Sequence, residues 1–266
     1  AASDVYKRQT RAWVRELAGW LGAAAVSLVT AGAVASSARA DLLFRDGDSM
    51  VVAMLARSLL SGEPLDWAMS SVLFLPESAA FTALDEAVPV DASGLFAISA
   101  VVNLLALYGA IRLTAGRARA GMAPVAWSVL ALAVFGVLAM TDVSASREAL
   151  DLASLQLTTT YYSATVVAAV LTIGIVRRMI DSRALMAWPS IGLGVVALVS
   201  TLSNPLYAAW ATIPLVMLLA IASVSPGLRS RAPVIIAVLL AGTTLGFLSR
   251  IPVSYTHLRA HETKAN

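Results

Sequence analysis

The sequence predicts an all-α protein, a polytopic membrane bundle of about seven transmembrane helices whose long first loop lies on the extracytoplasmic side. Three observations lead to this fold class. The chain is 59% hydrophobic with a mean hydropathy of +0.80, whereas soluble domains are roughly 45–50% apolar. Apolar runs close to the ~20 residues that cross a bilayer recur along the chain. Arginines gather in alternate connections between those runs.

The two ends of the chain differ from the rest. Residues 1–9 (AASDVYKRQ) and 253–266 (VSYTHLRAHETKAN) are expected to be non-native, because they resemble translated sequencing-adapter read-through. Residues 10–252 are interpreted as one transmembrane domain that belongs to a longer protein. His257 and His261 are the only histidines, and the chain has no cysteine. The native part therefore lacks residues for a zinc site or for histidine acid–base chemistry.

The predicted spans follow one another with short connections, except after the first. They are residues 17–36, 94–114, 123–141, 161–176, 186–203, 206–224 and 232–249. The first run has an alternative interpretation, because Arg11 and Arg15 precede it and Ala38-Arg39-Ala40 resembles a leader cleavage site. Its apolar stretch of about 20 residues is longer than the roughly 7–15 of a leader core, which favours a span. In both cases residues 41–93 lie outside.

Charge in the connections orients the bundle. With the N-terminus in the cytoplasm, the inner segments of the native part hold ten arginines and two acidic residues. The outer segments hold five arginines and twelve acidic residues, nine of them within residues 37–93. Because basic residues mark the cytoplasmic side, we predict a multi-pass cell-membrane protein with a cytoplasmic N-terminus and a long, acidic extracytoplasmic first loop.

The long loop, residues 37–93, is expected to carry one or two helices on the membrane surface. Residues 47–62 place apolar side chains at helical spacing, and Gly62 and Pro64 follow as stop signals. This helix is too short to span and is expected to lie along the outer membrane face. Residues 70–88 form a second candidate, interfacial or partly inserted, in which Pro76-Glu77 marks a helix start.

A cluster of charges, FRDGDSM, opens the first loop helix and contains Arg45, Asp46 and Asp48. Carboxylates at a helix N-terminus are stabilised by capping and by the helix dipole, by roughly 0.3–1 kcal/mol each, and Arg45 is expected to pair with one of them. The alternative is catalytic. With Asp41 close by, an enzyme that activates an acceptor hydroxyl at the outer face would place its general base here.

The loop motif resembles the GT-C superfamily, the multi-spanning glycosyltransferases that use polyprenyl-phosphate sugars. The stretch DGDSMVVAMLARSLLSGEPLDW is similar to the acidic motif, Leu-Leu-x-Gly helix end and following aromatic residue of that family. At the level of architecture the resemblance covers nearly all native residues, and at the level of motif about residues 41–67. It implies sugar transfer to an acceptor hydroxyl at the extracytoplasmic face, as a part of cell-envelope synthesis.

The resemblance also implies roles for residues. Asp46 or Asp48 would be the base or orient the acceptor, and the motif leaves open which one. Asp142, in the next outer loop, would be a second catalytic carboxylate, unless it is an ordinary charge at a helix end. Glu148 would support it in the substrate site. Arg45 or Arg147 would bind the lipid phosphate, because a guanidinium matches phosphate oxygens.

Several polar or small residues have a structural interpretation beside a functional one. Asn204 could contact substrate, although the Ser203-Asn204-Pro205 sequence favours a tight turn. Tyr161 and Tyr162 are expected to be interfacial anchors. Asn103 is expected to bond a neighbouring helix rather than a ligand. Gly242 and Gly246 form a GxxxG pattern suited to close helix packing.

The expected partners are a lipid-linked sugar donor and membrane lipids, and no nucleic acid. A hard divalent cation is the one cofactor left open, because an acidic outer site without histidine suits it; no metal ligand is assigned. Two other functions remain as alternatives. The protein could be a transporter, although its spans carry almost no ionisable residue away from their ends. It could also be a non-catalytic membrane scaffold.

Overall fold

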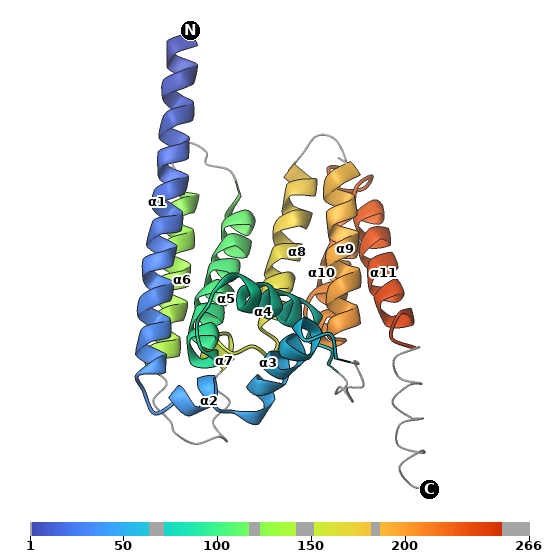
Figure 1. Ribbon diagram of the computed structural model, residues 1–266. Helices are drawn as coiled ribbons and strands as arrows, with labels where there is room; N and C mark the ends of the chain where they lie inside the picture. The colour runs from blue at the N-terminus through green and yellow to red at the C-terminus, as the bar shows by residue number, and fades with distance from the viewer. Residues whose placement is uncertain (1, 64–71, 117–122, 142–151, 182–186, 252–266) are drawn as a thin grey trace, which may run out of the picture.

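The computed structural model describes residues 2–63, 72–116, 123–141, 152–181 and 187–251, and these form helices and turns without a strand (Figure 1). The all-α prediction is confirmed for this part of the chain. A π-helical turn, η1 (Ala208–Thr212), leads into α10. The helices are α1 (Ala2–Ala35), α2 (Ala40–Phe44), α3 (Gly47–Leu60), α4 (Leu75–Ala87), α5 (Ala92–Ala115), α6 (Pro124–Thr141), α7 (Leu152–Leu155), α8 (Ser163–Asp181), α9 (Ala187–Ser203), α10 (Ile213–Ala222) and α11 (Ala232–Leu248).

Four of these helices are long and apolar enough to cross a membrane. They comprise Ala12–Ala35 of α1 and the whole of α5, α6 and α8. Three shorter apolar helices follow at Ala187–Ser203, Ala208–Ala222 and Ala232–Leu248. By length and composition, the chain therefore has several helices that can span a bilayer, as expected of a multi-pass membrane protein.

The long helices pack side by side in two groups (Figure 1). In the first, α1 lies along α6 and α5 around a core that contains Leu104, Tyr108 and Leu132. In the second, α8, α9 and α11 pack around Leu193 and Leu239. Contact between α5 and α8 joins the two groups, so they form one continuous bundle.

The first helix is an integral part of the bundle. Ala23, Ala31 and Val34 of α1 are almost completely buried in the first core. A Cβ atom at Gly136 of α6 would lie 2.5 Å from Oγ1 of Thr30, so α1 and α6 approach closely. The first helix therefore packs against both α6 and α5.

The GxxxG pattern of α11 packs against α9. A Cβ atom at Gly242 would lie 2.6 Å from the carbonyl oxygen of Gly194, and one at Gly246 would lie 2.6 Å from that of Leu198. Both distances are closer than a methyl group tolerates, so only glycine allows the two backbones to approach this far. Gly242 and Gly246 therefore form the close helix-packing face that the sequence predicts.

Substitution of Gly242 by leucine is therefore expected to destabilise the bundle. The side chain must displace the α9 backbone, and overpacking of this kind costs about 1–3 kcal/mol. Thermal unfolding in detergent would measure the loss. The matched control is Gly192→Leu in α9, where an added Cβ meets no atom within 4 Å. Equal melting temperatures for the two variants would contradict this account of the contact.

The two ends of the bundle differ in charge and in structure. At the end that is lower in Figure 1, α2, α3 and α4 lie across the bundle beside the segment 156–162. We call this the acidic end. At the opposite end, here called the basic end, α5 and α8 finish in turns that contain Arg112 and Arg178.

The loop helix α3 packs against the bundle through one face and leaves large apolar side chains exposed on another. Val52 and Ala56 pack with Phe81, Leu95 and Phe96 in a small core between α3, α4 and α5. The most exposed large apolar side chains of the helix are Met50, Met54, Leu59 and Leu60. A helix that packs through one side and leaves methionine and leucine exposed on another suits a lipid surface.

Candidate functional site at the acidic end

The polar segment 156–162 runs through the acidic end without regular structure, and residues 156–160 are buried. Buried irregular backbone needs hydrogen-bond partners from elsewhere, and two helices provide them. Asn103 Nδ2 of α5 donates to the carbonyl oxygen of Thr158 at 3.0 Å. Thr159 Oγ1 donates to the carbonyl oxygen of Ser49 in α3 at 2.8 Å. These bonds hold the segment against the start of α3.

Next to this contact, Tyr161 joins the two aspartates of the loop motif. Its phenol oxygen lies 2.9 Å from Oδ2 of Asp46 and 3.3 Å from Oδ2 of Asp48. Asp46 is half-buried and Asp48 is exposed. The phenol has a single hydrogen to donate, and the two carboxylates share it, with Asp46 the closer acceptor. The structure therefore brings both predicted carboxylates together at one hydroxyl group.

The interpretation of Asp46 and Asp48 as residues that stabilise the N-terminus of α3 applies only in part. Asp46 occupies the N-cap position of α3 with φ −68° and ψ 134°, but its side chain forms no capping hydrogen bond. Its carboxylate accepts from Tyr161 instead. Asp48 lies in the first turn of α3, where the helix dipole favours it. Arg45 pairs with Asp41 at 2.8 Å and not with Asp46 or Asp48 as expected, since Asp41 is one helical turn earlier on α2.

Tyr161 has a larger role than the interfacial anchor predicted for it. Burial, followed by the hydrogen bond and the charge of Asp46, raises the pKa of its phenol well above the usual range. The phenol therefore keeps its proton at neutral pH and remains a donor to the carboxylates. The sequence signal was the polar run QLTTTYY, residues 156–162, which reaches into the start of a predicted span and is unusual next to a bilayer.

A further carboxylate, Glu77 of α4, lies inside the acidic end and was not singled out for function. Only 9% of the residue is exposed. Its Oε1 accepts from the backbone N–H of Ala164 at the start of α8, at 3.2 Å, while Oε2 has no partner among the described residues. Burial raises the pKa of Glu77 to about 7, although its hydrogen bonds to backbone N–H groups act in the opposite direction.

The two helices that meet at Glu77 are each preceded by an aromatic residue in the left-handed region. Phe74, before α4, has a φ of 48°, and Tyr162, before α8, has a φ of 68°. Such conformations cost of order 1–3 kcal/mol for residues other than glycine and gather at functional sites. The Tyr162 ring packs edge-on against Trp210 of η1, with centroids 6.0 Å apart. A π-helical turn is itself a frequent feature of functional sites.

Asn204 is 1% exposed and lies in the turn that follows α9. Its Nδ2 donates to Oγ1 of Thr165, and its Oδ1 accepts from the N–H of Leu206, both at 3.0 Å. Both ends of the amide thus serve the turn and its contact with α8. Asp142, Arg147 and Glu148, the remaining predicted site residues, lie outside the described residues.

The acidic end offers few ligands for a metal. Among the described residues no group of three or more histidine, cysteine, aspartate or glutamate side chains gathers. Asp46 and Asp48 provide two carboxylates at one place, which suits a magnesium-type ion that also takes phosphate oxygens from a substrate. The donors among the described residues therefore fit a hard cation shared with substrate, and by themselves they do not complete a site made of protein ligands alone.

The comparisons with known proteins give no relative. The sequence matches no family profile and no curated protein, and the structure matches no solved structure.

Proposed function

We propose that this protein is a membrane glycosyltransferase of the GT-C type that transfers a sugar from a polyprenyl phosphate to an acceptor hydroxyl at the extracytoplasmic face. The observation that carries the proposal is the convergence of Asp46 and Asp48 on the hydroxyl of Tyr161. Two carboxylates held side by side next to a membrane-surface helix suit a group that accepts a proton from a substrate hydroxyl.

The proposed topology has seven spans with the N-terminus in the cytoplasm. Each of the seven apolar runs of the sequence coincides with a helix or with η1 and α10 together. Among the described residues, Arg112 and Arg178 lie in the last turns of α5 and α8, and Arg231 bonds the carbonyl oxygen of Ile180 near the end of α8. The positive-inside rule would assign this basic end to the cytoplasm. The acidic end, with α3 and α4, then faces outward, where a lipid-linked donor would present its sugar.

In the proposed reaction, Asp46 or Asp48 accepts the proton of the acceptor hydroxyl as its oxygen attacks the anomeric carbon. A bond forms between that oxygen and carbon on one face of the sugar. The bond between the anomeric carbon and the phosphate oxygen breaks on the opposite face, and lipid phosphate leaves with the electron pair. The result is inversion at the anomeric carbon. A hard cation bound at these carboxylates would neutralise charge on the leaving phosphate.

The experiment that tests the proposal replaces Asp46 and Asp48 by asparagine, one at a time, in the full-length gene. Loss of a general base costs about 10²–10⁴-fold in rate, so at least one variant is expected to abolish most of a cell-envelope glycan. The matched control is Asp41→Asn, because Asp41 is an exposed carboxylate in the same loop that pairs with Arg45 and not with Tyr161.

Membrane levels of each variant must equal those of the wild type. Normal glycan in both variants at normal expression would sink the catalytic assignment and leave the transporter and scaffold alternatives. Loss of glycan in Asp41→Asn as well would show that the loop needs its charges in general rather than the two carboxylates that meet Tyr161.

A further inference from the structure

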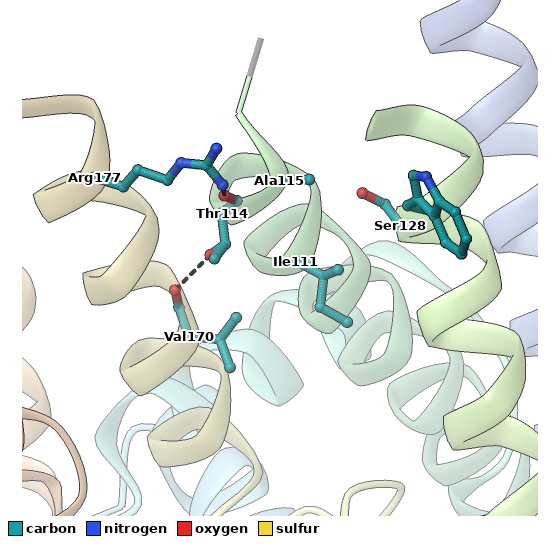
Figure 2. Close-up of a pocket in the computed structure, with 7 residues that line it drawn as sticks. Ile111, Thr114, Ala115, Ser128, Val170 and Arg177 are labelled. Atoms are coloured by element: carbon teal, nitrogen blue, oxygen red, sulfur yellow. Dashed lines mark hydrogen bonds between the residues drawn. The ribbon is translucent and has the colours of Figure 1, made fainter. Parts of the chain in front are cut away.

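At the basic end, a groove of about 270 Å³ lies between α6 and α8 on the surface of α5. Figure 2 shows its two sides, with Arg177 on α8 and Ser128 on α6 facing each other across Ile111 and Ala115 of α5. The volume is below the roughly 300–1,000 Å³ of pockets that hold a whole small molecule. The residues that line it are Ile111, Thr114, Ala115, Trp127, Ser128, Val170 and Arg177.

The walls of the groove are chemically apolar although two hydroxyl groups line it. Thr114 Oγ1 lies 2.9 Å from the carbonyl oxygens of Ala110 and Val170, and Ser128 Oγ donates to the carbonyl oxygen of Pro124 at 2.7 Å. Both hydroxyl protons are thus directed at backbone. The groove therefore offers methyl and methylene surface to an occupant, which suits a hydrocarbon chain.

Arg177 adds one cation at the rim of this groove. Its Nη1 donates to the carbonyl oxygen of Thr114 at 2.5 Å, which fixes the guanidinium at the end of α5. The side chain is 43% exposed, and its only nearby carboxylate among the described residues is that of Asp181, 3.9 Å from Nε. Arg112 is different, because Glu16 pairs with it through both carboxylate oxygens, at 2.5 and 3.0 Å.

Exposed tryptophan side chains indicate where the groove lies relative to the lipid headgroups. Trp127 of α6 and Trp188 of α9 are exposed by 65% and 79%. Both lie in the first turns of their helices at the basic end, and Trp127 lines the groove itself. Exposed tryptophans near the end of a helical bundle mark the headgroup region of a bilayer. The rim of the groove therefore lies where lipid phosphates are, and its apolar part points toward the acyl chains.

We propose that this groove is a binding site for one anionic phospholipid of the leaflet at the basic end. Part of an acyl chain lies against Ile111, Ala115 and Val170, and the headgroup phosphate accepts hydrogen bonds from Arg177. A guanidinium matches phosphate oxygens geometrically, and basic pockets between membrane helices bind anionic headgroups. The site is at the opposite end from Asp46 and Asp48, so it does not depend on the proposed sugar transfer.

The test compares the full chain in nanodiscs that contain phosphatidylglycerol with the same protein in pure phosphatidylcholine. Wild-type protein is expected to melt at a higher temperature with the anionic lipid and to retain about one such lipid in native mass spectrometry. Arg177→Gln is expected to weaken this binding by roughly five-fold or more, from the ~1 kcal/mol that one basic residue contributes at a membrane surface. Ala115→Phe is expected to do the same by filling the groove without a change of charge.

The matched control is Arg229→Gln, which removes an exposed arginine from the α10–α11 connection at the same end. It should retain the response to phosphatidylglycerol. Because Arg177→Gln also loses its bond to Thr114, the readout is the difference between the two lipids and not the melting temperature itself. An unchanged difference in Arg177→Gln and Ala115→Phe overturns the proposal. So does an equal loss in Arg229→Gln, or an equal stabilisation by inorganic phosphate in place of the lipid.

Discussion

Replacement of Glu77 by glutamine is expected to stabilise the protein at pH 8 and to leave its stability unchanged near pH 4. The reason is the buried position of this carboxyl group, whose pKa rises from 4.5 to about 7 in the folded protein. Between these values the folded protein binds a proton that the unfolded chain has lost. The free energy of unfolding therefore falls as the pH rises through this window and stays low above it.

The size of the effect follows from the two pKa values of Glu77. Above both values, the difference between them lowers the free energy of unfolding by about 3 kcal/mol, which is a large part of the stability of a typical domain. Glutamine is neutral at every pH and keeps an oxygen that can accept from the N–H of Ala164. The variant should therefore lack the decline between pH 5 and pH 8 that the wild type shows.

Thermal unfolding of the purified protein in detergent, followed across this pH range, measures the difference. Glu86→Gln is the matched control, because Glu86 lies on the same helix and is exposed. Its unfolding curve should follow that of the wild type at each pH. A Glu77→Gln variant whose melting temperature declines with pH as steeply as the wild type would show that another group is responsible.

The same variant also separates stability from function. A carboxyl group with a pKa near 7 is well matched to proton transfer at neutral pH, and buried groups with perturbed pKa values gather at functional sites. If the acidic end performs the proposed transfer, Glu77→Gln should reduce glycan synthesis while it raises the melting temperature. A more stable variant with full activity would show that Glu77 has only a structural role, at the start of α8.

The sequence was sufficient to predict the longer helices of this bundle, although not the short α2 and α7, because the signals of long helices are local. Long apolar runs, a glycine pair in α11 and a stop at Gly62 each depend on neighbouring residues only. Two features of the same segments were not predictable in this way. The run at 206–224 begins as the π-helical turn η1, and Phe74 and Tyr162 adopt positive φ values, neither of which the apolar pattern indicates.

The site shows the same division between local and distant information. Asp46 and Asp48 were identified because two carboxylates stand out beside an apolar run. Tyr161 was not associated with them, because 115 and 113 residues separate it from Asp46 and Asp48. Glu77 was interpreted only as part of a helix start after Pro76. Its burial depends on α8, whose first turn takes the carboxylate as an N-terminal partner.

Replacement of Tyr161 by phenylalanine is expected to lower the rate of the proposed transfer by up to about 100-fold, the cost of a reactive group displaced by roughly 1 Å. The ring stays in place, and only the donor to Asp46 and Asp48 is lost. As a residue that positions the carboxylates, Tyr161 should affect kcat more than KM. Stability should fall by only about 1 kcal/mol, the net contribution of a hydrogen bond, since Asp46 is half-buried and Asp48 exposed.

Combination of this change with Asp46→Asn tests whether the phenol acts through the carboxylate. If it does, the double variant should be no slower than the slower single variant, because the two residues then act as one unit. Multiplied losses in the double variant would mean that Tyr161 contacts substrate independently. Tyr162→Phe is the control, since Tyr162 packs against Trp210 through its ring. Full activity in Tyr161→Phe would show that the contact between this phenol and the two aspartates is not needed for catalysis.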